Sequence, residues 1–120
     1  MERTFLALGA LNALVSVACG AFGAHGLRAR VTPRLLEVWE TAARYQMYHA
    51  LALFAVAWLA SRGAPAASAG WAFTLGIVLF SGSLYAMTLT GVTRLGAVTP
   101  LGGVSFLVGW ALVARLAWQR

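Results

Sequence analysis

Four long stretches of this chain contain no charged residue, and they constrain its fold more than any other feature. They cover residues 4–27, 45–61, 63–93 and 95–114. A helix needs about 20 apolar residues, at a rise of about 1.5 Å per residue, to cross the hydrocarbon core of a bilayer. Since 61% of the residues are hydrophobic and only 10% are charged, the composition is typical of a membrane protein,.

Turn and cap residues divide the chain into four predicted spans within one membrane domain, residues 1–120. We expect the spans at about 4–26, 44–61, 69–90 and 99–118. Thr32-Pro33 and Thr99-Pro100 are each typical of a helix start, with threonine as the N-cap and proline in the first position. Short connections between the spans predict antiparallel neighbours, with both termini on the same side of the membrane.

Residues 33–44, which precede the second span, form an amphipathic pattern. Charged side chains fall on one side of a helical projection and Leu35, Val38 and Trp39 fall elsewhere,. This pattern predicts a helix at the membrane interface, or a helical extension that bends into the span near Arg44. The expected fold is therefore an all-α integral membrane protein, an antiparallel four-transmembrane-helix bundle with an interfacial amphipathic helix between spans 1 and 2.

The net charge of +6 comes from arginines that are scattered between the apolar stretches. Because they form no basic stripe interleaved with aromatic residues, we expect no nucleic-acid partner; the lipid bilayer is the expected partner. Four arginines fall at one end of the predicted bundle and five at the other, so the orientation stays open and a dual topology remains an alternative,. Cys19 is the only cysteine, which excludes an intramolecular disulfide,.

The two histidines are the best candidates for chemistry. His25 ends the first predicted span and His49 lies near the start of the second, so in an antiparallel pair both would approach one membrane face. Such a pair could bind a haem iron or a quinone, or relay protons. The structural alternative is that His25 caps a helix and His49 bonds to a carbonyl, with Tyr45 and Tyr48 as interfacial anchors. Two imidazoles alone make an incomplete zinc site, so no metal is expected.

Hydroxyl groups and glycines in the spans favour close helix packing. Ser81, Ser83 and Tyr85 are expected to form hydrogen bonds between helices, with a polar pore lining as the alternative. Small residues let helices approach closely in lipid. The candidate packing glycines are Gly20, Gly23, Gly26, Gly82, Gly102, Gly103 and Gly109.

Four sequence blocks, taken in order, resemble the domain-of-unknown-function 423 family. They are GAFGAHGL at residues 20–27, YQMYHAL at 45–51, LFSGSLY at 79–85, and TPLGG at 99–103 followed by Gly109-Trp110. The resemblance covers nearly the whole chain and implies a small multi-pass protein of the bacterial cytoplasmic (inner) membrane. The family brings no established activity, substrate or cofactor with it.

No catalytic constellation accompanies these features. The chain contains no aspartate, and no serine lies in a glycine-flanked nucleophile elbow,. We therefore expect a non-enzymatic accessory or scaffold protein without a cofactor, which packs against itself or a membrane partner. The alternative is a small carrier, channel or ligand-binding protein for a quinone, haem or proton that uses His25 and His49.

Overall fold

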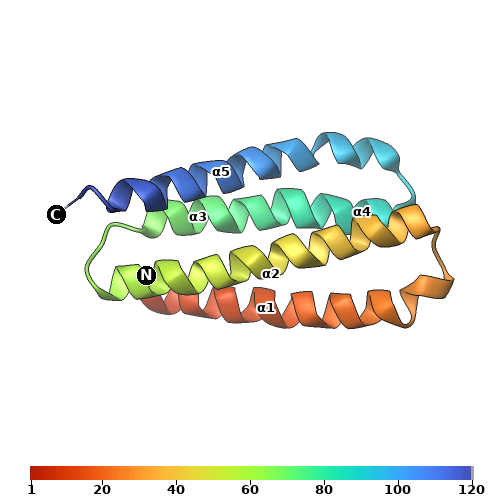
Figure 1. Ribbon diagram of the computed structural model, residues 1–120, viewed down its shortest axis with the longest axis horizontal. Coiled ribbons are helices and arrows are strands. Elements are labelled where there is room, and N and C mark those ends of the chain that lie inside the picture. The colour runs from red at the N-terminus through yellow and green to blue at the C-terminus, as the bar shows by residue number, and fades with distance from the viewer. Residues whose placement is uncertain (120) are drawn as a thin grey trace.

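The computed structural model describes residues 1–119, and every regular element in that part of the chain is helical. The α-helices are α1 (Glu2–Ala24), α2 (Pro33–Ser61), α3 (Ala67–Gly76), α4 (Gly82–Thr90) and α5 (Thr99–Leu116). Three shorter elements are η1 (Leu27–Ala29), η2 (Ile77–Ser81) and η3 (Thr93–Ala97). Because α3, η2 and α4 follow one another without a break, the chain forms four long rods (Figure 1). The expected all-helical membrane-type fold is confirmed in this respect.

Defined cap and turn residues end the rods. The Thr32 hydroxyl accepts a hydrogen bond from the Leu35 amide at 3.2 Å, and Pro33 takes the first position of α2, as the sequence predicts. Gly63 follows α2 with φ +82° and Gly91 follows α4 with φ +73°. Glycine adopts this left-handed conformation at little cost, so the chain reverses within a few residues at both places.

α2 is the central rod. α1 runs along it in the opposite direction, since Asn12 bonds to Gln46 and Ser16 bonds to Ala43. On its other side α2 packs against α3, η2 and α4, while α5 packs against α3 and η2 (Figure 1). The whole measures 51 × 25 × 17 Å, so its long axis exceeds the roughly 30 Å hydrocarbon core of a bilayer,.

The expected interfacial helix over residues 33–44 is not a separate element. α2 is a single helix of 29 residues, about 43 Å long, without an interruption near Arg44,. Its first turns are held inside the bundle: the Trp39 indole N–H donates to the Cys19 carbonyl at 2.7 Å, and Ala42 is fully buried. Of the two alternatives for residues 33–44, the structure therefore has the helical extension, and its apolar side packs against the neighbouring rods.

Three segments are long and apolar enough to cross a membrane: Glu2–Ala24, Ala67–Thr90 and Thr93–Leu116. α2 is long enough but less apolar, because its first turns carry charged residues and its middle carries Gln46 and His49. The least apolar rod is therefore the one that contacts α1, α3 and α4 together.

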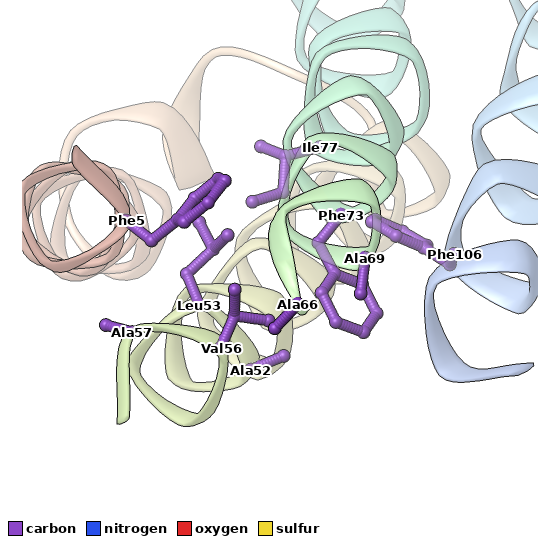
Figure 2. Close-up of a cluster of buried hydrophobic side chains, with 10 residues drawn as sticks. All are labelled: Phe5, Ala52, Leu53, Val56, Ala57, Ala66, Ala69, Phe73, Ile77 and Phe106. Atoms are coloured by element: carbon purple, nitrogen blue, oxygen red, sulfur yellow. The ribbon is translucent and has the colours of Figure 1, made fainter. Parts of the chain in front are cut away.

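An apolar core joins the four rods. Figure 2 shows Phe5 of α1 and Phe106 of α5 entering from opposite sides, with Phe73 of α3 between them. α2 contributes Leu53 and Val56, both fully buried. Each of the four rods thus contributes at least one large side chain to this core.

The third rod contains a π-helical turn, η2, between α3 and α4. The Gly82 amide bonds to the Ile77 carbonyl five residues earlier. Gly102 of α5 faces this turn so closely that a Cβ there would lie 2.7 Å from the Phe80 Cα. The sequence predicts an ordinary helix over 69–90, because no local residue pattern signals a π-turn; such turns are frequent near functional sites.

Candidate functional site

His49 is buried between α2 and α5, and both of its ring nitrogens have partners. Nδ1 lies 2.8 Å from the Tyr45 carbonyl of the same helix, and Nε2 accepts a hydrogen bond from the Trp110 indole N–H at 3.1 Å. A carbonyl can only accept, so Nδ1 carries the proton and the imidazole is neutral. The ring also stacks on Phe106 with centroids 3.5 Å apart and planes 5° apart.

The contacts of His49 with Phe106 and Trp110 join α2 to α5 across a depression between these two helices. Both helices pack on α3 and η2. A pocket of about 460 Å³ remains open in this depression. Tyr45 and Tyr48 line it from α2, and Leu107 and Trp110 line it from α5. Phe80 of the π-turn also lines it, with its ring 4.7 Å from that of Tyr45 and 5.5 Å from that of Phe106. We call this pocket the aromatic groove.

The structure does not bring the two histidines together. His25 is exposed and follows the last residue of α1. His49 instead lies level with Gly9, where an added Cβ would contact the Ala50 carbonyl. His25 follows Gly9 by sixteen positions, which at about 1.5 Å per residue puts the two histidines about 24 Å apart along the bundle,. The expectation that both approach one membrane face is not met, because the antiparallel pairing sets His49 against the middle of α1.

A series of hydrogen bonds near this site links three helices, α4, α2 and α1. The Tyr85 hydroxyl of α4 donates to Gln46 Oε1 at 2.7 Å, and Gln46 Nε2 donates to Asn12 Oδ1 of α1 at 3.0 Å. Asn12 in turn donates to the Leu8 carbonyl at 2.8 Å. Sequence reasoning named Tyr85 but missed Gln46, the residue that joins these hydrogen bonds. A polar amide near the start of a charge-free stretch is the signal that could have found it.

The predicted hydroxyl sites also bond between helices. Ser81 of η2 is buried and donates to the Ala42 carbonyl of α2 at 2.8 Å. Ser83 of α4 lies 2.6 Å from the Thr99 hydroxyl of α5 and also donates to Phe80 of its own rod. Ser81 and Ser83 thus lie at contacts of their rod with α2 and α5.

The candidate packing glycines fall into three groups. Gly23, Gly102 and Gly109 face another helix so closely that an added Cβ would press on Trp39, Phe80 and Phe73 respectively. Gly26 lies against Phe22 of the preceding turn, whereas Gly20, Gly82 and Gly103 have open space at the Cβ position. Sequence reasoning left out Gly70 and Gly76, whose Cβ atoms would meet Phe5 and Phe106.

The arrangement is suited to holding helices and an apolar ligand rather than to acid–base chemistry. His49 has no nitrogen free for a proton or an iron atom while Tyr45 and Trp110 occupy it,. Among residues 1–119 no three side chains of His, Cys, Asp or Glu come together to hold a metal ion.

Fold and site together define a helical membrane protein, and comparison with known proteins agrees. The model of the DUF423 family, described as a protein of unknown function, matches residues 19–103. UPF0382 membrane protein YwdK of Bacillus subtilis is 51% identical over 118 residues, which cover 96% of each chain. A UPF0382 membrane protein of Staphylococcus saprophyticus is 47% identical over 112 residues, 92% of this chain and 93% of the relative. The chain belongs to the DUF423 family of membrane proteins. No solved structure matches it.

Proposed function

We propose that this chain is a non-enzymatic accessory protein of the cytoplasmic membrane, which all four rods cross. In this arrangement α2 crosses because its neighbours shield it, although it is the least apolar rod. The outer faces of α1 and α5 meet lipid or another membrane protein. Bacterial relatives described as membrane proteins support the location.

The position of the charges supports four spans. Arg28, Arg30 and Arg94 lie in the connections at one end of the rods, and Arg62 lies at the other. Arginines at helix ends suit lipid headgroups. The last residue, Arg120, which we expect at headgroup level, lies outside the described residues.

The hydrogen bonds that polar side chains form between helices support the proposal of a structural role. Ser16 and Ser81 donate to carbonyls of α2, and Ser105 of α5 donates to a carbonyl of α3. Gln46 and His49 hold further bonds to other rods. Within residues 1–119 every buried side-chain nitrogen or oxygen has a partner. A polar group that binds a neighbouring helix stabilises the bundle by about 0.6 kcal/mol in lipid, so these groups serve architecture.

The outer face of α1 is the surface that suits a protein partner. α1 packs mainly on α2, and only 17% of its most apolar window is buried. Leu6, Leu14 and Val17 are more than half exposed and mixed with alanines, a surface that another helix can approach closely,. We propose a second copy of this chain or another membrane protein as the occupant of that face.

Site-specific photo-crosslinking in native membranes tests this role. A benzophenone amino acid at Leu14 on the outer face of α1 should give a discrete protein adduct after irradiation. The same group at Val78 of the third rod, which is equally exposed, is the matched control and should give a weaker adduct or none. If Leu14 yields no protein adduct and the purified protein is strictly monomeric in lipid nanodiscs, the accessory role is wrong.

A further inference from the structure

The aromatic groove is a ligand-sized opening on the flank of the bundle. Its volume of about 460 Å³ lies within the roughly 300–1,000 Å³ range of small-molecule sites,. Leu107 on its rim is 69% exposed, so the groove opens sideways, toward lipid in a membrane-embedded bundle. A ligand would therefore enter from the bilayer.

We propose that the aromatic groove binds a lipid-soluble molecule with a flat ring that carries a hydrogen-bond acceptor, the chemistry of a membrane quinone. The proposal concerns binding and includes no redox step. It does not depend on the proposed protein contact of α1, which lies on another face of the bundle.

The lining of the groove favours a flat ring over an acyl chain. Aromatic side chains line the opening: Tyr45 and Tyr48 come from α2, Phe106 and Trp110 come from α5, and the Phe80 ring contacts both Tyr45 and Phe106. Aromatic rings gain about 0.5–1.5 kcal/mol from offset or edge contacts beyond the area that they bury, and an aliphatic chain does not supply these contacts. Gly103 also lines the groove and has no side chain to fill it. Nothing else occupies this space, since no atom lies within 4 Å of the Gly103 Cβ position.

The tyrosine hydroxyls supply the polar contact. Tyr48 is 51% exposed and Tyr45 is 37% exposed, and both lie on the groove wall. Neither hydroxyl bonds to another residue of the described chain, whereas Tyr85 is committed to Gln46. A phenol donates readily to a carbonyl oxygen, so the ligand's acceptor belongs near these two side chains.

His49 acts here as a positioning residue. Its stacking on Phe106 and its bond to Trp110 fix two rings of the opposite wall. With both nitrogens occupied it does not need to contact the ligand. The groove is thus shaped before a ligand arrives, which lowers the cost of ordering on binding.

The experiment uses the full chain with 5-fluorotryptophan in phosphatidylcholine nanodiscs, and decylubiquinone as the probe. Fluorine NMR reports on the tryptophans separately, and the spectrum of Trp110→Phe identifies the signal from the groove. We expect a saturable shift of the Trp110 signal. Gly103→Leu should weaken binding at least tenfold by filling the groove. Tyr48→Phe should weaken it about fivefold by removing one hydrogen bond of about 1 kcal/mol.

Gly82→Leu is the matched control, since Gly82 also has open space at its Cβ but does not line the groove. It should bind the probe like the unmodified chain. The proposal is overturned if the Trp110 shift never saturates, if Gly103→Leu and Gly82→Leu bind equally, or if decanol shifts the signal as strongly as the quinone. Should Gly103→Leu fail to fold, equal binding by Tyr48→Phe and the unmodified chain would also overturn it.

Discussion

Replacing Gly102 with alanine should destabilise the bundle, while the same change at its neighbour Gly103 should not. Gly102 is buried against the π-turn, where an added Cβ would lie 2.7 Å from the Phe80 Cα and closer still to the Phe80 amide nitrogen. The obstacle is backbone, which cannot rotate away as a side chain could. Gly103 has nothing within 4 Å of its Cβ position.

The magnitude follows from the displacement that Gly102→Ala requires. To restore ordinary contact, α5 must move outward from η2 by about 1 Å, and overpacking of this kind costs about 1–3 kcal/mol,. Alanine is the better helix former by about 1 kcal/mol, but this gain applies to both variants and cancels in their difference. The difference in unfolding free energy between Gly102→Ala and Gly103→Ala should therefore be about 1–3 kcal/mol.

Reversible unfolding in mixed micelles of a mild detergent and sodium dodecyl sulfate, followed by circular dichroism, measures this difference. Gly102→Ala should unfold at a lower dodecyl sulfate fraction than Gly103→Ala, and Gly103→Ala should match or exceed the unmodified chain. Equal midpoints for the two variants would refute the close contact between α5 and the π-turn.

Two further substitutions test the hydrogen bonds of α2. Gln46→Leu should lower the unfolding free energy by about 2–4 kcal/mol in the same assay, because it removes the donor to the Asn12 side-chain oxygen and the acceptor of the Tyr85 hydroxyl,. Ser61→Ala, which loses only a bond within its own exposed turn, is the control, and equal losses would contradict the role of Gln46. Trp39→Phe should cost about 1 kcal/mol through the lost bond to the Cys19 carbonyl,. Trp58→Phe on the exposed face of α2 should cost less, and a reversed order would contradict this assignment.

Much of the fold could be predicted from the distribution of charges and caps. The charge-free stretches gave the helical membrane class, and Thr32-Pro33 marked the start of α2 correctly. For residues 33–44 the sequence left two alternatives, an interfacial helix or a helical extension of the second span, and α2 continues from Pro33 to Ser61 as one helix. The amphipathic pattern did not reveal what covers the apolar side, where Trp39 and Ala42 meet other rods.

The site was harder to predict because it depends on register. His49 could be named from the sequence, but its partner could not: Trp110 lies sixty-one residues further along the chain. Placing His49 and His25 at one membrane face assumed a register between α1 and α2 that differs from the observed one, in which Gly9 lies opposite Ala50. A slide of one helix along another leaves the composition of both unchanged, so composition cannot fix the register.

The central claim is that α2 crosses the membrane in spite of its polar residues because the other rods enclose it. The direct measurement is labelling of single cysteines by a membrane-impermeant maleimide in intact cells, in a Cys19→Ala chain. Ala29→Cys precedes α2 and Ser61→Cys ends it, and both positions are exposed. We predict that the labelled fraction of Ala29→Cys and the labelled fraction of Ser61→Cys add up to one. This sum holds whether the chain takes one orientation in the membrane or two. Full labelling at both positions, or at neither, would contradict the account.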